Sequence, residues 1–432
     1  MKEDFLHYIW KFQKFNTRSL TTTTQETIKI KRVGDYNTTR SGPDFFNSQI
    51  YIDEQLWAGT VEIHINSSDW YVHHHEADAA YDNVILHVVW QDDVELYRKD
   101  GTQVPTLSLK EKVSPELLNN YQNLLQTSTN KWIYCEGQLE EIPQIAKTLW
   151  KEQLYIQRLI RKSENLKELV TSLKGDWEAV LYQQLFQNFG LNVNGNAFKS
   201  IARATDFSIV RKVNRNNENI EALFFGQAQL LRKTTEIEDV SYKIELLNQY
   251  TYYQSKYKLS NNGVLPVEFF RLRPPNFPTI RIAQFSALYS MHKDLFFKII
   301  EAKNVDELYK LFEVTPGEFW NTHYTFYKES KPRKKKLSKA FVDLIIINTV
   351  IPVKFLYAQS IGNDIVEEII TIIGELPPEH NNITKGFANN SISIASALDS
   401  QAVIELKKEY CNNKKCLHCS FGNYLLNKGK KV

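Results

Sequence analysis

The sequence predicts an α+β protein in which an N-terminal mixed-sheet domain, residues 1–114, precedes a mainly α-helical region, residues 115–432. Two observations predict this division. Before residue 114, short runs rich in β-branched and aromatic residues alternate with turn residues, as in strands and hairpins. After it, amphipathic stretches with helical spacing dominate, at about 115–126, 140–170, 176–189, 219–233 and 239–258.

Composition limits the class of protein. The 432 residues are 42% hydrophobic and 24% charged, which suits a large folded core and excludes a disordered or fibrous chain. The 53 basic and 50 acidic residues nearly balance, so the net charge of +3 does not by itself indicate a polyanionic partner. The first residues show no secretory pattern, and we find no apolar run of membrane-spanning length. The expected location is the cytoplasm, with no membrane partner.

The first predicted elements are a helix and a strand. Apolar residues at positions 5, 6, 9, 10 and 12 share one helical face. Residues 27–33 nearly alternate apolar and basic side chains and stop at Gly34, as expected of a strand.

A predicted hairpin at residues 42–64 carries the main candidate site. The pattern predicts strands at residues 45–52 and 56–64, joined by an acidic turn. Asp44 and Glu62 are then about equally distant from that turn. Facing carboxylates can converge, and they repel each other unless a cation lies between them. The hairpin therefore predicts a divalent metal site for Mg²⁺ or Mn²⁺. The alternative is a surface hairpin with two unrelated acids.

A crossover and a buried strand follow the hairpin. The run Ser67-Ser68-Asp69 predicts the start of a short helix or loop, and residues 84–90 form a nearly continuous apolar strand. Residues 94–97 and 104–107 predict a further hairpin. The predicted order is thus a helix, three strands, a helical crossover and another strand.

Resemblances to two known families add to this prediction of the fold. The phrase Pro43-Asp44 followed by Glu62-Ile63-His64 resembles the motif of the PD-(D/E)XK nuclease superfamily, whose core has the element order just described. This implies a restriction-endonuclease-like fold in which Asp44 and Glu62 hold the ion. His64 stands where that family usually has lysine, and a neutral imidazole more readily binds metal or acts as a base. Over nearly all its length the chain also resembles an uncharacterised bacterial family, of the domain-of-unknown-function kind, which implies kinship without an activity.

Histidines near the hairpin allow a second ligand set. Six candidate ligands fall within 35 residues: Asp44, Glu62, His64, His73, His75 and Asp78. Such a set would suit a hydrolytic zinc or manganese ion. Any one of these side chains alone is more often structural, and His87, inside the apolar strand, is predicted to be a satisfied core histidine.

The cysteines predict a second metal site. Cys411, Cys416 and Cys419 lie within nine residues, and Cys135 is the expected fourth ligand of a zinc ion or a 4Fe-4S cluster. His418 is a competing ligand that favours zinc. The arrangement is similar in outline to the four-cysteine cluster of RecB-type PD-(D/E)XK nucleases, although Cys135 follows the core motifs here. Unligated cysteines in a reducing compartment are the alternative.

Cations of the helical region are candidate contacts to phosphate. Arginines border a proline-rich loop at residues 271–281, and residues 328–339 are the densest basic cluster. The predicted substrate-binding residues are Arg271, Arg273, Arg281, Arg333, Lys334 and Lys335. The alternatives are internal salt bridges for the arginines and a solvated loop for the lysines.

These patterns give three hypotheses. The first is a metal-dependent, nuclease-like phosphodiesterase acting on DNA or RNA, with His64 orienting or deprotonating the attacking water. The second is an inactive nuclease fold that binds nucleic acid or serves in assembly. The third is a zinc-dependent hydrolase of a non-nucleic substrate. The sequence does not choose between catalysis and binding.

Overall fold

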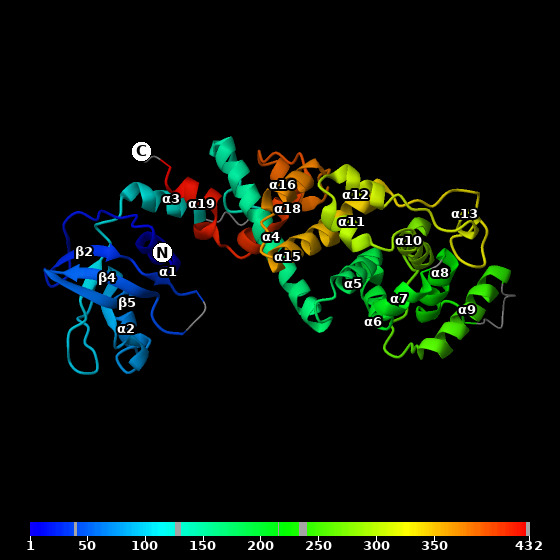
Figure 1. Ribbon diagram of the computed structural model, residues 1–432. Helices are drawn as coiled ribbons and strands as arrows, with labels where there is room; N and C mark the ends of the chain where they lie inside the picture. The colour runs from blue at the N-terminus through cyan, green and yellow to red at the C-terminus, as the bar shows by residue number, and fades with distance from the viewer. Residues whose placement is uncertain (39–40, 126–130, 215, 233–239, 429–432) are drawn as a thin grey trace. The chain divides into compact units, whose positions relative to one another are not determined.

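The computed structural model describes residues 1–38, 41–125, 131–214, 216–232 and 240–428, which form two compact units (Figure 1). The first unit comprises Met1–Trp150, Asn390–Ile392 and Leu406–Val432, and the second comprises Lys151–Asn389 and Ser393–Glu405. The boundary predicted between residues 114 and 115 lies inside the first unit. Each unit is described by itself.

The first unit combines a sheet with short helices. Its elements in chain order are α1 (Glu3–Lys11), β1 (Leu20–Thr21), β2 (Thr27–Arg32), β3 (Asp35–Tyr36), β4 (Phe45–Ile52), β5 (Gln55–Asn66), α2 (Asp69–Val72), the 3₁₀ helix η1 (Ala79–Tyr81), β6 (Val84–Gln91), β7 (Thr106–Ser108), α3 (Pro115–Leu125), η2 (Leu139–Glu141), the first part of α4 (Gln144–Ser172), the π-helical η5 (Leu406–Cys411), η6 (Cys416–His418) and α19 (Ser420–Leu426).

The sheet is mixed, with the strand order β1-β2-β4-β5-β6-β7 and β3 paired to β4. Neighbours from β1 to β5 are antiparallel, whereas β5, β6 and β7 run parallel to one another. The Thr23 N–H donates to the Thr106 carbonyl at 2.8 Å, so the two ends of the sheet meet and the sheet is nearly closed, like a barrel. The predicted class, a mixed N-terminal sheet followed by a mainly helical region, is confirmed.

The hairpin predicted at residues 42–64 is formed by β4 and β5. Ile52 pairs with Gln55 next to the turn, and Phe45 pairs with Val61 at the far end. Asp53 occupies the left-handed region with φ of 52°, as tight hairpin turns require, and its carboxylate accepts the Thr27 N–H at 2.9 Å. This register brings Asp44, just before β4, beside Glu62 on β5.

The second predicted hairpin is confirmed in part. Tyr97 pairs antiparallel with Gln103, and the Val104 N–H donates to the Leu96 carbonyl, so residues 96–104 form a short hairpin. Residues 106–108 leave it as β7 and join β6 in parallel. The reason is the open edge of β6, whose His87 N–H and Val89 carbonyl bond to Pro105 and Leu109. A central strand must pair its backbone groups, and this requirement takes precedence over a local turn.

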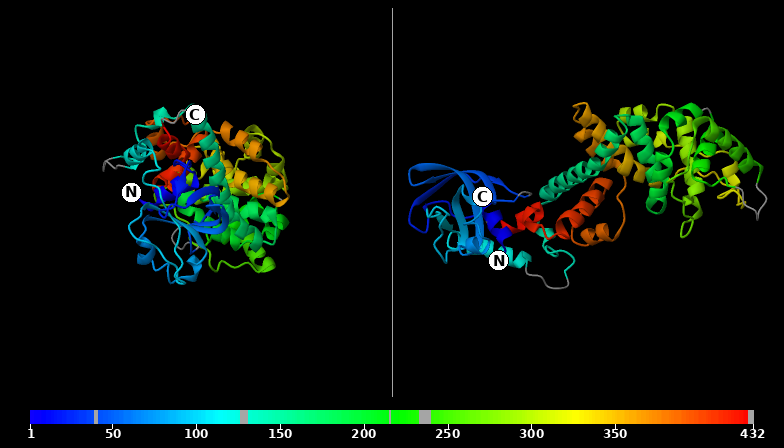
Figure 2. Two further views of the ribbon diagram at one scale, coloured as in Figure 1. Left: turned by 90° about the vertical axis from the view of Figure 1, so that its left-hand side faces the viewer. Right: turned by 90° about the horizontal axis from the view of Figure 1, so that it is seen from below.

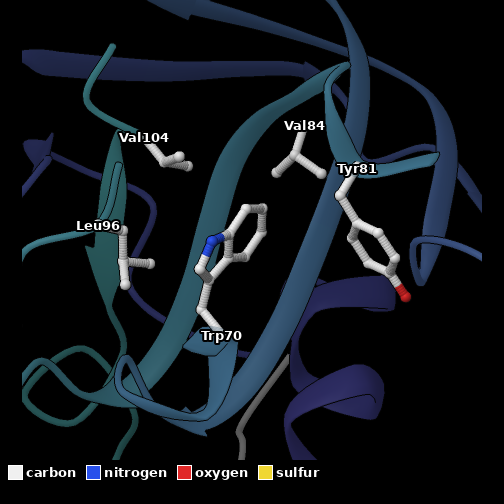
Figure 3. Close-up of a cluster of buried hydrophobic side chains, with 5 residues drawn as sticks. All are labelled: Trp70, Tyr81, Val84, Leu96 and Val104. Carbon is white, nitrogen blue, oxygen red and sulfur yellow. The ribbon is translucent and has the colours of Figure 1, made fainter. Parts of the chain in front are cut away.

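A buried hydrophobic cluster supports the crossover between β5 and β6. It consists of Trp70, Tyr81, Val84, Leu96 and Val104, all at most 9% exposed. Figure 3 shows the Trp70 indole between the Leu96 and Val104 side chains and those of Val84 and Tyr81. Trp70 belongs to α2 and Tyr81 to η1, so the cluster fixes both ends of the loop that carries His73 and His75.

The second unit is mainly helical. After the remainder of α4, its elements are α5 (Trp177–Phe189), α6 (Leu191–Arg203), α7 (Phe207–Val213), α8 (Asn217–Gln227), α9 (Ser241–Tyr257), η3 (Pro274–Asn276), α10 (Pro278–Met291), α11 (Leu295–Glu301), α12 (Val305–Leu311), α13 (Phe319–Thr322), α14 (Lys339–Ile345), the π-helical η4 (Ile346–Val350), α15 (Ile351–Ser360), α16 (Val366–Glu375), α17 (Asn382–Ala388) and α18 (Ala397–Glu405).

The five helical stretches predicted from the sequence correspond to α3, α4, α5, α8 and α9. The fourth was predicted too long: α8 ends at Gln227 because Gln229 takes a left-handed backbone with φ of 60°. The predicted ends at residues 126, 233 and 239 lie outside the described residues.

One stretch of the second unit corrects the expectation about apolar runs. The continuous helical segment Lys339–Ser360 has 22 residues and is long and apolar enough, by length and composition, to cross a membrane. Its most apolar window is 78% buried within the structure, as in the core helix of a globular domain.

Gly226 of α8 lets two core helices approach closely. A Cβ atom added there would lie 2.1 Å from the Tyr250 ring of α9. We therefore expect Gly226→Ala to destabilise the protein by about 1–3 kcal/mol through overpacking. Gly374 in α16 is the matched control, since a Cβ there meets no atom within 4 Å and alanine should stabilise the helix by about 0.4–1 kcal/mol. Urea unfolding of both variants tests this, and equal effects would contradict the packing account.

Candidate metal and acid–base site

Polar residues interrupt the apolar centre of the sheet on one face. Glu62 and His64 are two residues apart on β5, so their side chains point to the same side of the sheet. His87 of β6 pairs with Glu62 across the parallel ladder. Glu62 is 5% exposed, His64 2% and His87 0%. Buried polar groups are costly unless they are bonded, so their partners reveal what the cluster is built to do.

Asp44 and Glu62 are linked through the backbone of each other's strand. The Asp44 N–H donates to Glu62 Oε2 at 3.1 Å, and the Ile63 N–H donates to Asp44 Oδ2 at 3.0 Å. Burial and the neighbouring Asp44 raise the pKa of Glu62 from 4.5 to about 9. The predicted convergence of the two residues is therefore observed, at a site where a second negative charge is strongly disfavoured.

Two imidazoles flank the other Glu62 oxygen, and a third extends the cluster. Glu62 Oε1 lies 3.4 Å from His64 Nε2 and 3.3 Å from His75 Nε2, and His73 Nδ1 lies 3.1 Å from His64 Nε2. Ligand atoms of His64, His73 and His75 all fall within 4.8 Å of one another. Within the described part of the chain, the buried His75 Nε2 has no hydrogen-bond partner. His73 is exposed, so the cluster opens to solvent on its side.

His64 is held from behind by His87. His64 Nδ1 and His87 Nε2 are 2.8 Å apart. The ring of Tyr81 stacks on that of His75, with 3.7 Å between the ring centroids. Burial, then the neighbouring imidazoles, lower the pKa of His64 to about 2, and burial lowers that of His87 to about 3. Both rings are thus neutral at physiological pH, which is the form that binds metal. His87 was predicted to be a satisfied core residue, but its Nδ1 has no partner among the described residues.

The structure adds a pair that the sequence did not reveal. His7 of α1 places Nε2 at 3.1 Å from Asp44 Oδ2, and the Tyr36 hydroxyl lies 3.2 Å from His7 Nδ1. Burial opposes the charged form of His7, but Asp44 and nearby acids outweigh it and raise the His7 pKa. A lone histidine in an amphipathic helix gives no sequence signal for a partner 37 residues away. Asp78, in contrast, caps η1 through the Ala80 N–H.

The other predicted residues lie elsewhere. Cys135, Cys411, Cys416 and Cys419 line a separate cavity in the first unit. In the second unit Arg281 and Lys335 are buried and bond to their own chain, Arg281 to Gln284 and Asn276 and Lys335 to the carbonyls of Trp320 and Asn321. The remaining predicted substrate-binding residues are exposed: Arg271, Arg273, Arg333 and Lys334.

The donor set at the sheet fits a transition metal better than magnesium. Mg²⁺ selects oxygen ligands and keeps several waters, whereas imidazole nitrogen with one carboxylate suits Zn²⁺ or Mn²⁺. His64, His73, His75 and Glu62 are the residues that would hold such an ion. Asp44 is engaged by Ile63 and His7, next to this set.

Glu62 should make the metal-free protein sensitive to pH. With a pKa of 4.5 when unfolded and about 9 when folded, Glu62 keeps its proton only in the folded chain between these values. Its contribution to stability therefore falls as pH rises through that window. With a chelator present, we expect Glu62→Gln to melt above wild type at pH 8 and close to it at pH 5. Thermal melts across pH measure this, and parallel curves for the two proteins would refute the assigned burial of charge.

Comparison with known proteins identifies one family. The family model described as a protein of unknown function (DUF2851) matches residues 3–382, a range that includes the hairpin, the histidines and Cys135 and ends before Cys411. No curated protein and no solved structure shows significant similarity to the chain.

Proposed function

We propose that this chain, which belongs to the DUF2851 family of unknown function, is a metal-dependent hydrolase of phosphodiester bonds in nucleic acid. One observation carries the proposal. The buried Glu62 Oε1 lies 3.3–3.4 Å from the imidazole nitrogens of His64 and His75, and the exposed His73 places a third nitrogen 3.1 Å from that of His64.

These separations support ion binding. Donors on a tetrahedral ion at a metal–ligand distance of about 2.1 Å stand about 3.4 Å apart. The spacings at Glu62 match this value, and no proton can bridge Glu62 Oε1 to both imidazoles at once. A divalent cation held there would supply the positive charge that an ionised Glu62 needs, and it would lower the pKa of a coordinated water so that hydroxide forms near neutral pH.

The Asp44–His7 pair supports acid–base chemistry beside that ion. Ile63 fixes the Asp44 carboxylate and Tyr36 contacts the far nitrogen of His7, so both side chains are oriented before substrate binds. A histidine whose pKa is raised above its usual range near 6.5 exchanges protons close to physiological pH. Asp44 and His7 are suited to accept the proton of the attacking water or to protonate the leaving oxygen.

The choice of a phosphodiester rests on the resemblance to PD-(D/E)XK nucleases. Asp44 immediately precedes β4 and Glu62 lies on the antiparallel neighbour β5, and a short crossover leads to a parallel strand, β6. This is the strand order that accompanied the motif in the sequence. His64 takes the lysine position of that motif as a candidate ligand, so the ion would be held by more nitrogen than in a carboxylate-only site.

His73 and His74 offer a matched pair for testing the metal site. His73 points into the cluster, whereas the His74 side chain is 83% exposed. We expect His73→Ala to weaken Zn²⁺ or Mn²⁺ binding by at least about 100-fold and His74→Ala to leave it unchanged. Calorimetric titration of the metal-free protein measures both. Equal affinity in the two variants would exclude the histidine cluster.

Turnover separates the role of Asp44 from metal binding. We expect the metal-loaded protein to cleave single- or double-stranded DNA or RNA, and Asp44→Asn to bind metal normally while cutting at least about 100-fold more slowly. Gel assays with Zn²⁺, Mn²⁺ and Mg²⁺ cover the substrates. Metal binding without cleavage of any nucleic acid would overturn the phosphodiester claim and favour a hydrolase of another substrate.

Exposed cations of the second unit support nucleic acid as the ligand. Arg333 and Lys334 are exposed beside the buried Lys335. If they contact phosphate, Arg333→Ala should weaken binding about equally for all sequences and reduce the slope of log affinity against log salt by about 1. Lys167→Ala, an equal loss of charge on α4, is the control. Gel-shift titrations at several salt concentrations would show the same slope for both variants if Arg333 is merely solvated.

A further inference from the structure

Four cysteines from distant parts of the first unit converge on one cavity. Cys135 lies in the turn before η2, Cys411 ends η5, and Cys416 and Cys419 begin and follow η6. The cavity has a volume of about 20 Å³, and apolar side chains such as Leu124, Leu406 and Phe421 complete its wall. All four cysteines are free thiols in the structure.

The surrounding chain is shaped to bring the four cysteines to the wall of one cavity. Lys414 adopts a left-handed backbone with φ of 56°, which turns the chain between Cys411 and Cys416. A Cβ atom on Gly422 would lie 2.1 Å from the Cys416 carbonyl, so only glycine allows α19 to pack against the cysteine loop. Such a turn and close approach cost conformational freedom and require an interaction that offsets the loss.

An unpaired donor points to a ligand in this cavity. Trp150 is 5% exposed and lies beside Cys419, and its indole N–H has no hydrogen-bond partner of ordinary geometry among the described residues. A neutral thiol is a weak acceptor, whereas a metal-bound thiolate carries negative charge and accepts well. A thiolate at Cys419 would therefore satisfy a buried group that the free thiol leaves unsatisfied.

We propose that Cys135, Cys411, Cys416 and Cys419 bind a thiophilic metal centre, and that this centre holds α1 in position at the candidate active site. The second half of this statement rests on the proposed function. Four thiolates are the ligand set of structural zinc and of iron–sulfur clusters. Zinc and a cluster share this ligand set, and metal analysis distinguishes them. His418, predicted as a competing ligand, does not line the cavity and stacks on Tyr36.

The link from the cysteines to the site runs through α19 and His418. Cys419 is the N-cap of α19, where Asn423 Oδ1 accepts the Tyr8 hydroxyl at 2.7 Å and the Asn427 amide donates to the same hydroxyl at 2.9 Å. Tyr8 neighbours His7 on α1, and Figure 2 shows the C-terminal segment beside that helix. The His418 ring stacks on Tyr36 with 16° between their planes, and Tyr36 contacts His7.

Metal analysis of the full chain, purified without oxygen, tests the centre. We expect one metal centre per chain, either one zinc or four irons with the visible absorbance of a cluster. It should survive in His73→Ala, which removes a ligand of the other site, and in His418→Ala, but be lost in Cys411→Ser. Unchanged metal in Cys411→Ser would overturn the centre.

Thiol titration of wild type guards against a variant that fails to fold. We expect the native protein to hide its four thiols from a thiol reagent until a strong chelator is added. Four thiols that react at the same rate with and without chelator would overturn the proposal.

Hydrogen exchange tests the positioning role without relying on turnover. Stripping the cysteine site, by Cys411→Ser or by chelator, should lower the protection of α1 amides at least about 10-fold while β5 and β6 amides keep theirs. Unchanged protection of α1 would overturn the positioning role. Because these measurements need no substrate, failure of the hydrolase proposal would be recognised separately, by absent cleavage with the cysteine metal in place.

Discussion

The burial of Glu62 against Asp44 is the constraint on which the first unit depends. A carboxylate in the centre of a sheet, next to a second acid, is stable only as a protonated group or beside positive charge. Each of the surrounding elements contributes groups to the surroundings of these two acids. The β4–β5 register supplies the Asp44 N–H, the α2–η1 loop supplies His73 and His75, and α1 supplies His7. The hydrophobic cluster around Trp70 holds that loop in place, so packing fixes the site geometry.

The sequence predicts contacts that depend on local periodicity. The hairpin follows from two alternating runs and an acidic turn, and the approach of Asp44 to Glu62 follows from their equal distance to that turn. The convergence of Cys135 with the three C-terminal cysteines follows from counting ligands. His7 could not be predicted in this way, because its contact with Asp44 depends on how α1 docks on the sheet. The departure of residues 106–108 from the hairpin predicted at residues 94–107 has the same origin, since the open edge of β6 lies outside any local window.

His64 in place of the expected lysine changes what the site can do. An ammonium group would act as a fixed positive charge near Glu62, whereas imidazole offers a lone pair. The contact with His87 decides which nitrogen is free. If His64 Nδ1 donates to His87 Nε2, then His64 Nε2 faces Glu62 and His73 as an acceptor, which is the orientation that a metal ligand requires. His87 then carries its proton on Nδ1, which has no hydrogen-bond partner in the described part of the chain. The free-energy cost of this unpaired donor accompanies the orientation of His64.

A second buried glutamate in the same chain shows what a purely structural carboxylate looks like. Glu221 of α8 is fully buried, yet its oxygens accept from Tyr242 at 2.6 Å, Trp320 at 2.9 Å and Asn217 at 2.6 Å. Burial raises its pKa to about 7, and these three donors limit the rise. Glu62 receives one backbone N–H among the described residues and otherwise faces two neutral imidazoles, and its pKa reaches about 9. The chain can satisfy a buried acid with its own donors, as it does at Glu221. The lack of such donors at Glu62, with nitrogen lone pairs in their place, is therefore the property expected of a carboxylate that binds a cation.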